Sequence, residues 1–165
     1  MRKRTVLVTG ATGYIGGRLV PALVHRGYNV RCLVREPEKA RGRFGPSVEI
    51  VGGDLLQPDS LSVEQFDAGA AYYLVHALAS SGDLQEEETA AATNFVRSAL
   101  RAGVERLVYL GGLGSEATTS PHLATRHDVG RILRDSGIPT LEFRAYVIRQ
   151  IFSVCKVIGE EARIG

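Results

Sequence analysis

The chain has 165 residues, of which 44% are hydrophobic and 23% are charged. This length suits one domain that can bury a sizeable core, and the composition excludes a disordered or fibrous chain. Twenty Lys and Arg against 18 Asp and Glu leave a formal net charge of +2, which is too small to indicate a nucleic-acid or membrane partner.

Short apolar runs rich in β-branched residues alternate with amphipathic segments along the chain. This alternation is typical of βαβ units and predicts a mostly parallel sheet. The predicted strands are residues 5–9, 29–34, 48–51, 70–75, 106–110 and 139–148. Apolar residues at helical spacing predict three helices, each followed by a glycine suited to end it. These glycines are Gly27, Gly103 and Gly137.

A glycine-rich turn, residues 10–16, joins the first predicted strand to the first predicted helix. Its G-x-x-G-x-x-G spacing is typical of a dinucleotide site: Gly10 permits a tight turn, Gly13 lets the backbone approach a pyrophosphate, and Gly16 lets the helix pack closely. The helix N-terminus attracts the anion through unpaired N–H groups and its dipole. The alternative is a turn that binds nothing. The residues expected to bind the cofactor here are Gly10, Thr12, Gly13, Tyr14, Ile15 and Gly16.

The alternation and the turn together predict an α/β protein with a doubly wound Rossmann fold, whose six-stranded, mostly parallel sheet lies in three α/β/α layers. We expect one NAD(P)-binding domain over residues 1–147. Residues 148–165 are expected to form a helical tail, or the start of a truncated substrate subdomain, because their apolar residues have helical spacing. These residues are Ile148, Ile151, Phe152, Cys155 and Ile158.

The segment at residues 8–17, Val-Thr-Gly-Ala-Thr-Gly-Tyr-Ile-Gly-Gly, resembles the start of the extended and atypical short-chain dehydrogenases/reductases. The Gly-Asp-Leu at residues 53–55 matches that family's acidic dipeptide after the third strand. Residues 72–76 and 109–114 resemble an atypical branch with nucleotide-sugar-epimerase and NmrA-like relatives. The resemblance covers residues 4–147 and implies a nicotinamide dinucleotide as cofactor.

The resemblance also implies roles for two loops. Asp54, followed by Leu55, would hydrogen-bond the adenine ring, and the loop from His76 to Leu78 would lie near the nicotinamide ribose. The alternative for Asp54 is a carboxylate that only stabilises its own loop.

The end of the second strand bears on the choice between NADP and NAD. An NADP site offers Arg to the 2′-phosphate, whereas an NAD site carries an acidic residue for the ribose hydroxyl. Arg35 ends the strand, and Lys39 lies within a turn of it if Pro37 opens a short helix. NADP is therefore favoured. NAD stays possible, since Glu36 is the competing carboxylate and Arg35 is alternatively a solvated surface charge.

Short-chain dehydrogenases use a Tyr-x-x-x-Lys pair, and the matching segment here has His122 and Arg126 at the two positions. His122 is a candidate general acid, and Arg126 is a candidate clamp for a ribose or phosphate oxygen. The alternative for His122 is a polar residue in the first turn of an exposed helix. The family's serine after the fifth strand is displaced, which leaves Ser115 as a weak candidate.

No metal site is expected, because His122 and His127 do not stack on one helical face and have no third ligand nearby. Cys32 and Cys155 form no C-x-x-C pair, and the apolar run after the basic N-terminus is too short for a signal peptide, so a reducing cytoplasm is expected.

Two functions are compatible with these features. The first is an NADP-dependent oxidoreductase that acts on a small carbonyl or alkene substrate. The alternative is a non-catalytic NAD(P)-binding redox sensor or assembly module, which the missing Tyr and Lys favour. The sequence names neither the substrate nor the oligomeric state.

Overall fold

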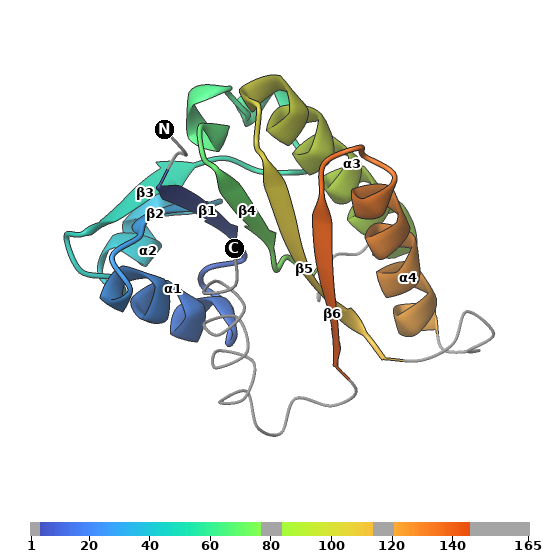
Figure 1. Ribbon diagram of the computed structural model, residues 1–165, viewed down its shortest axis with the longest axis horizontal. Helices are drawn as coiled ribbons and strands as arrows, with labels where there is room; N and C mark the ends of the chain where they lie inside the picture. The colour runs from blue at the N-terminus through green and yellow to red at the C-terminus, as the bar shows by residue number, and fades with distance from the viewer. Residues whose placement is uncertain (1–3, 77–83, 114–120, 146–165) are drawn as a thin grey trace.

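A computed structural model describes residues 4–76, 84–113 and 121–145 of the chain (Figure 1). The described strands are β1 (Thr5–Thr9), β2 (Asn29–Val34), β3 (Val48–Gly52), β4 (Ala70–Tyr73), β5 (Arg106–Gly112) and β6 (Thr140–Ala145). The α-helices are α1 (Gly16–His25), α2 (Pro37–Arg41), α3 (Leu84–Ala102) and α4 (Pro121–Arg134). Two 3₁₀ turns, η1 (Pro58–Ser60) and η2 (Glu64–Phe66), lie between β3 and β4.

The strands form one sheet in the order β3-β2-β1-β4-β5-β6, and all of the pairings are parallel. Helices α1 and α2 pack on one face, whereas α3 and α4 pack on the other (Figure 1). The strand order reverses direction between β1 and β4, which is the topological switch point of a doubly wound fold. The predicted Rossmann architecture is confirmed.

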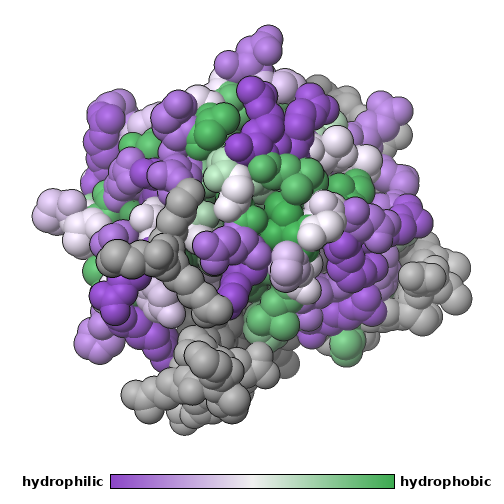
Figure 2. Space-filling model, turned by 45° about the horizontal axis from the view of Figure 1, so that its top comes forward, coloured by the Kyte–Doolittle hydropathy of each residue, from purple (hydrophilic) through white to green (hydrophobic). Residues whose placement is uncertain are grey.

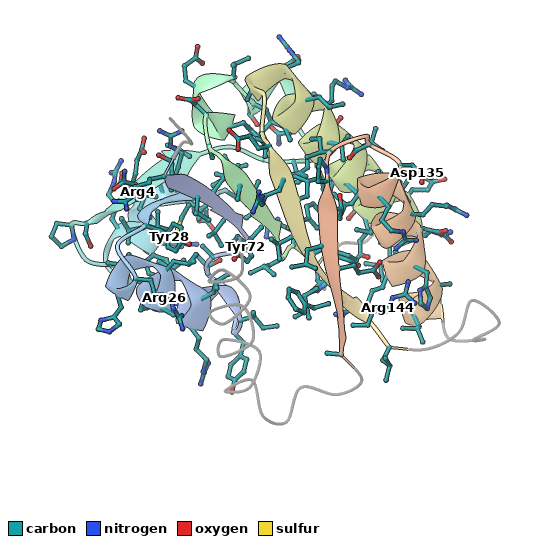
Figure 3. The ribbon with its side chains drawn as sticks, viewed as in Figure 1. Arg4, Arg26, Tyr28, Tyr72, Asp135 and Arg144 are labelled. Atoms are coloured by element: carbon teal, nitrogen blue, oxygen red, sulfur yellow. The ribbon has the colours of Figure 1, made fainter. Side chains whose placement is uncertain are left out.

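Each face of the sheet has its own apolar core. Leu7 of β1 is fully buried on the α3 and α4 face, where Phe66, Tyr73 and Phe95 meet edge to face or tilted, with ring centroids 5.0–5.7 Å apart. Burying one such aromatic side chain stabilises the fold by about 1.5–3 kcal/mol. On the α1 face, Tyr72 of β4 lies near the centre of the sheet (Figure 3).

The glycine after α1 ends that helix as predicted. Gly27 has a φ of +79°, and the Tyr28 N–H donates to the Leu23 carbonyl, which closes the last turn. Gly103 has a φ of +68° directly after α3, and the following N–H, from Val104, donates back into the helix. Such left-handed residues favour glycine because a side chain would clash with the backbone.

Strand boundaries differ from the predicted ones by one or two residues. The apolar run that predicted a strand to residue 75 leaves the sheet after Tyr73, because its partner β1 ends at Thr9. Strand β5 extends beyond the predicted residue 110, since Gly111 and Gly112 pair with β6. Described strand β6 spans Thr140–Ala145, and residues 146–165, including the predicted tail, lie outside the described residues.

Hydrophilic residues cover most of the face seen in Figure 2, around an apolar area near its centre. On the edge strand β6, Leu141 is 47% exposed. The opposite face of that strand is polar: Glu142 is paired with Arg134 of α4 and with Arg144 (Figure 3). None of the described helices is long and apolar enough to cross a membrane.

Candidate functional site

A cavity of about 590 Å³ opens at the carboxyl ends of β1, β2 and β4. The turn after β1, residues 9–16, forms one wall, and residues 33–35 and 53–56 form the side next to β2 and β3. Residues 73–76 and the start of α3 form the side next to β4. Ligands of doubly wound sheets bind in this crevice, at the switch point between the two halves of the sheet.

Two glycines of the turn are required by the protein's own backbone. Gly10 has a φ of +71°, and a Cβ there would lie 2.4 Å from the carbonyl oxygen of Leu74. A Cβ on Gly16 would lie 2.4 Å from the Gly10 carbonyl oxygen and 2.6 Å from the Cα of Ala11. The absence of a side chain at Gly16 therefore lets the start of α1 lie close to the backbone of Gly10 and Ala11.

Gly13 differs from these two glycines. Among the described residues, a Cβ at Gly13 would meet one atom beyond its chain neighbours within 4 Å, the Gly10 carbonyl oxygen at 3.2 Å. That carbonyl also accepts a hydrogen bond from the Gly13 N–H at 3.0 Å. Gly13 lines the cavity, so a larger side chain there would occupy space that a ligand needs.

The N-terminus of α1 provides hydrogen-bond donors at this wall. Among the described residues, the backbone N–H groups of Tyr14, Ile15 and Gly16 donate to no other backbone group. The helix has no side-chain cap and no acidic residue in its first turn. Unpaired N–H groups and the positive end of the helix dipole together suit an anion such as a pyrophosphate.

Arg35 lines the cavity at the end of β2, whereas Glu36 and Lys39, the other charged residues considered for this end, do not. Lys39, on the short helix that Pro37 begins as expected, is 76% exposed and pairs with Glu36. Lys39 and Glu36 thus pair with each other outside the cavity wall, and Arg35 is the one Lys or Arg among the described residues that line the cavity.

The Asp54–Leu55 loop is fixed from two sides. One carboxyl oxygen of Asp54 accepts the N–H of Leu56 at 3.0 Å, so this carboxylate stabilises its own loop as well as lining the cavity. The buried amide of Asn94 on α3 donates to the Leu55 carbonyl at 2.8 Å. The result is a loop held by hydrogen bonds at the side of the cavity next to β3.

His76 lines the opposite end of the cavity. Burial and, to a smaller extent, the nearby positive charge of Arg126 lower the pKa of His76 to about 4. Its imidazole is therefore neutral at physiological pH, with one nitrogen donating and the other accepting. Arg126 does not line the cavity, and its backbone carbonyl accepts the hydroxyl of Tyr109 at 3.0 Å, which ties α4 to β5.

Sequence reasoning missed Glu88 and Tyr73, which also line the cavity. Glu88 on α3 is 8% exposed, and its negative charge adds to burial in raising the pKa of Tyr73. The signal was present, because Glu88 falls on the apolar stripe of α3 with Ala91, Ala92 and Phe95. A charged residue on a buried helix face is uncommon without a partner or a function.

The structure brings ten predicted cofactor-binding residues to this one cavity, namely Gly10, Thr12, Gly13, Tyr14, Ile15, Gly16, Arg35, Asp54, Leu55 and His76. Lys39 is not part of the wall. His122 belongs to the first turn of α4, but its side chain lies outside the described residues, as do Ser115 and Leu78. Within the described ranges, no three His, Cys, Asp or Glu side chains are grouped as metal ligands would be.

Comparisons with known protein sequences agree with this geometry. The NmrA-like family matches residues 2–162. "Sterol demethylase protein B" of Methylococcus capsulatus is 32% identical over 131 residues, which are 74% of this chain and 39% of that protein. "Photosystem II assembly factor Ycf39" of Synechocystis is 31% identical over 106 residues, which are 63% of this chain and 32% of the relative. The chain thus spans less than half the length of these relatives.

Solved structures share the fold. The Citrobacter sp. triphenylmethane reductase complexed with NADP(H) has a TM-score of 0.76 at 24% identity, over 95% of this chain and 55% of that one. The Bordetella bronchiseptica enzyme WbmG in complex with NAD has a TM-score of 0.71 at 17% identity, over 85% of this chain and 52% of that one.

Proposed function

The chain belongs to the NmrA-like family, and on this premise we propose that its cavity binds a nicotinamide dinucleotide, with NADP(H) preferred over NAD(H). The observation that carries the proposal is the wall formed by Gly13 and the unpaired N–H groups at the start of α1. The pyrophosphate would lie on these groups, with adenosine toward Asp54 and nicotinamide toward His76. The NADP(H) and NAD complexes of the two structural neighbours support a dinucleotide of either kind.

The preference for NADP(H) rests on Arg35. A guanidinium offers paired N–H donors to the 2′-phosphate, whereas the ribose hydroxyl of NAD(H) gains little from it. Glu36, the carboxylate that would favour NAD(H), is paired with Lys39.

Arg35→Asp tests this preference. Because hydrogen bonds to charged groups are worth about 1.5–3 kcal/mol, we expect NADPH affinity to fall by about 10- to 100-fold and NADH affinity to change little. Arg26→Asp, at the far end of α1, is the matched control (Figure 3). An unchanged ratio of the two dissociation constants in Arg35→Asp would reduce Arg35 to a surface charge.

As an enzyme, the protein would reduce a small carbonyl or alkene. A bound NADPH supplies the hydride, and the chain has to supply a proton to the substrate atom that becomes negatively charged. His122 at the start of α4 is the proposed donor, and Arg126 is the proposed clamp for a ribose or phosphate oxygen. His76, neutral at physiological pH, can donate one hydrogen bond into the part of the cavity next to β4.

The experiment is single-turnover NADPH oxidation over a panel of carbonyl and enone substrates, with wild type and His122→Ala. Losing a general acid costs about 100- to 10,000-fold in rate, whereas NADPH affinity should barely change. Equal oxidation rates in both proteins would eliminate His122 as the acid.

The second candidate is a non-catalytic sensor or assembly module. It is favoured by His122 and Arg126, which stand where the Tyr and Lys of short-chain dehydrogenases are expected, and by the name of the Synechocystis relative, an assembly factor. No oxidation across the panel, together with tight NADPH binding, would favour this function. We also propose a cytoplasmic location for the protein, on the basis of its cysteine pattern.

A further inference from the structure

At the edge strand β6, the α1 face of the sheet is apolar and partly exposed. Phe143 packs against the apolar core of the α1 face, and Leu141, two residues earlier in the strand, has its side chain on the same face. Leu141 is 47% exposed, and Phe143 is half-buried. Their partners on β5, Val108 and Leu110, are buried, so the apolar surface that stays open lies along β6.

The described helices cover the two faces of the sheet unevenly. Helix α1 has its main contacts with β1 and β2, and α2 has its main contacts with β3, so both lie over that half of the sheet (Figure 1). On the opposite face, α4 packs against β5 and β6. Parallel sheets normally have helices on both faces. Among the described elements, no helix has its main contacts with β5 or β6 on the α1 face.

Residues 146–165 continue the chain directly from β6, and their sequence carries an apolar stripe. Apolar residues recur there at helical spacing, namely Ile148, Ile151, Phe152, Cys155 and Ile158. Polar and charged residues stand between them, namely Arg149, Gln150, Ser153 and Lys156. In a helix, these two sets would fall on opposite faces.

The length of this stripe fits the open surface of β6. As a helix, the stretch from Ile148 to Ile158 would be about 15 Å long. Along β6, the distance from Leu141 to Ala145 is about 13 Å. A helix that runs back from the carboxyl end of β6 would therefore cover the strand over its apolar length.

We propose that residues 148–158 pack as a helix on the α1 face of β5 and β6, with their apolar stripe against Leu141 and Phe143. A segment of the same chain is favoured over a separate partner, because it begins at the end of β6 and is held near this surface by the covalent chain. The inference goes beyond the proposed function, since the packing needs no dinucleotide and its test uses none.

Thiol reactivity tests this packing, because the chain has 2 cysteines in different surroundings. Cys32 on β2 is fully buried, and burial raises its pKa to about 12, so it serves as an unreactive reference. Cys155 lies on the apolar stripe, and we expect it to react with DTNB about 10-fold or more slowly in the folded protein than in the urea-unfolded chain. A Cys155 that reacts equally fast in both states would overturn the inference.

Leu141→Asp tests where the segment packs. A carboxylate is costly to bury under an apolar stripe, so the reaction of Cys155 should become about 10-fold or more faster, while Cys32 stays slow. Leu100→Asp is the matched control, because Leu100 is 52% exposed and belongs to α3, which packs on the opposite face of the sheet. It should leave the rate at Cys155 unchanged. Equal rates in the two variants would contradict the position on β6.

Dilution separates this packing from the docking of a second copy of the chain. Contact within one chain gives Cys155 a reaction rate that does not depend on protein concentration, whereas protection within a dimer is lost on dilution. Sedimentation of wild type and Leu141→Asp at the same concentrations reports the oligomeric state. Protection of Cys155 that disappears as a dimer dissociates would assign this face to a second copy and overturn the inference.

Discussion

Gly13 is the residue at which ligand binding and folding are most easily separated. Gly13→Val should still fold, because Gly13 has no left-handed φ and, among the described residues, the new Cβ would need only the Gly10 carbonyl oxygen, 3.2 Å away, to shift by a few tenths of an ångström. The side chain would occupy the place of the pyrophosphate, and we expect dinucleotide affinity to fall by about 10- to 100-fold. Calorimetric titration with NADPH, alongside circular dichroism, measures both properties.

Gly45→Val is the matched control, because Gly45 is exposed and no atom of the described residues beyond its chain neighbours lies within 4 Å of a Cβ there. It should keep wild-type affinity. A folded Gly13→Val protein with unchanged affinity would contradict the placement of the pyrophosphate.

His76 gives the protein a stability that depends on pH. Its folded pKa of about 4 lies below the unfolded value of 6.5, so between these pH values the unfolded chain binds a proton that the folded chain does not. The free energy of unfolding therefore falls as the pH drops through this window, by about 3 kcal/mol in total, and this contribution is fully present above pH 6.5.

Urea denaturation from pH 7 to pH 4 checks this prediction. In His76→Gln, the free energy of unfolding should fall less steeply with decreasing pH than in wild type. His25→Gln alters an exposed histidine and should keep the wild-type dependence on pH. Identical slopes in wild type and His76→Gln would show that His76 is not shielded from protons.

Single residues of the site were predictable where a rigid motif fixes them. The glycine turn, Arg35 and Asp54 follow strand ends, and strand ends of a parallel sheet meet at one edge. Lys39 was predicted to join Arg35, but one short helix turn lets it reach Glu36 instead. The apolar stripe of α3 shows that Glu88 lies on a buried face of the helix, but only the packing of α3 against the sheet brings Glu88 to the cavity.

At the scale of elements, Gly10 decides how closely β1 and β4 approach at their carboxyl ends. Gly10→Ala combines a left-handed φ with a Cβ 2.4 Å from the Leu74 carbonyl oxygen. Gly27 has a similar φ of +79°, but within the described ranges a Cβ there would have no atom within 4 Å beyond its chain neighbours. The two substitutions therefore share the conformational cost, and Gly10→Ala adds a clash with the backbone after β4.

We expect Gly27→Ala to lower the free energy of unfolding by about 1–2 kcal/mol. Gly10→Ala should lower it by about 1–3 kcal/mol more, because overpacking against backbone cannot relax cheaply. Urea denaturation of both variants gives the difference. Equal destabilisation would mean that the turn after β1 is not held against the segment after β4.

The elements themselves were predictable because each carries its own period and its own end signal. Strands in a parallel sheet are continuous apolar runs, and Gly27 and Gly103 mark helix ends through their left-handed conformations. Strand ends were less predictable. Strand β4 ends at Tyr73, which pairs with the last residue of β1, and β5 extends to Gly112 because β6 pairs with it there. Pairing with a neighbour, rather than local sequence, sets these boundaries.

At the scale of the whole molecule, the sheet order β3-β2-β1-β4-β5-β6 places the glycine turn at the switch point between its halves. In the proposed binding mode, adenosine would lie next to β2 and β3, where Arg35 and Asp54 line the cavity, and nicotinamide would lie next to β4, where His76 lines it. The fold therefore bears on the proposed binding, whereas the proposed catalysis rests on the start of α4, where His122 and Arg126 stand at the positions of the Tyr and Lys of short-chain dehydrogenases.

The most direct test of the central claim is calorimetric titration of the wild-type protein with NADPH and with NADH. We predict one binding site per chain that is saturable by NADPH, with NADH bound about 10-fold or more weakly. Absence of binding of both dinucleotides to the folded protein would contradict the account.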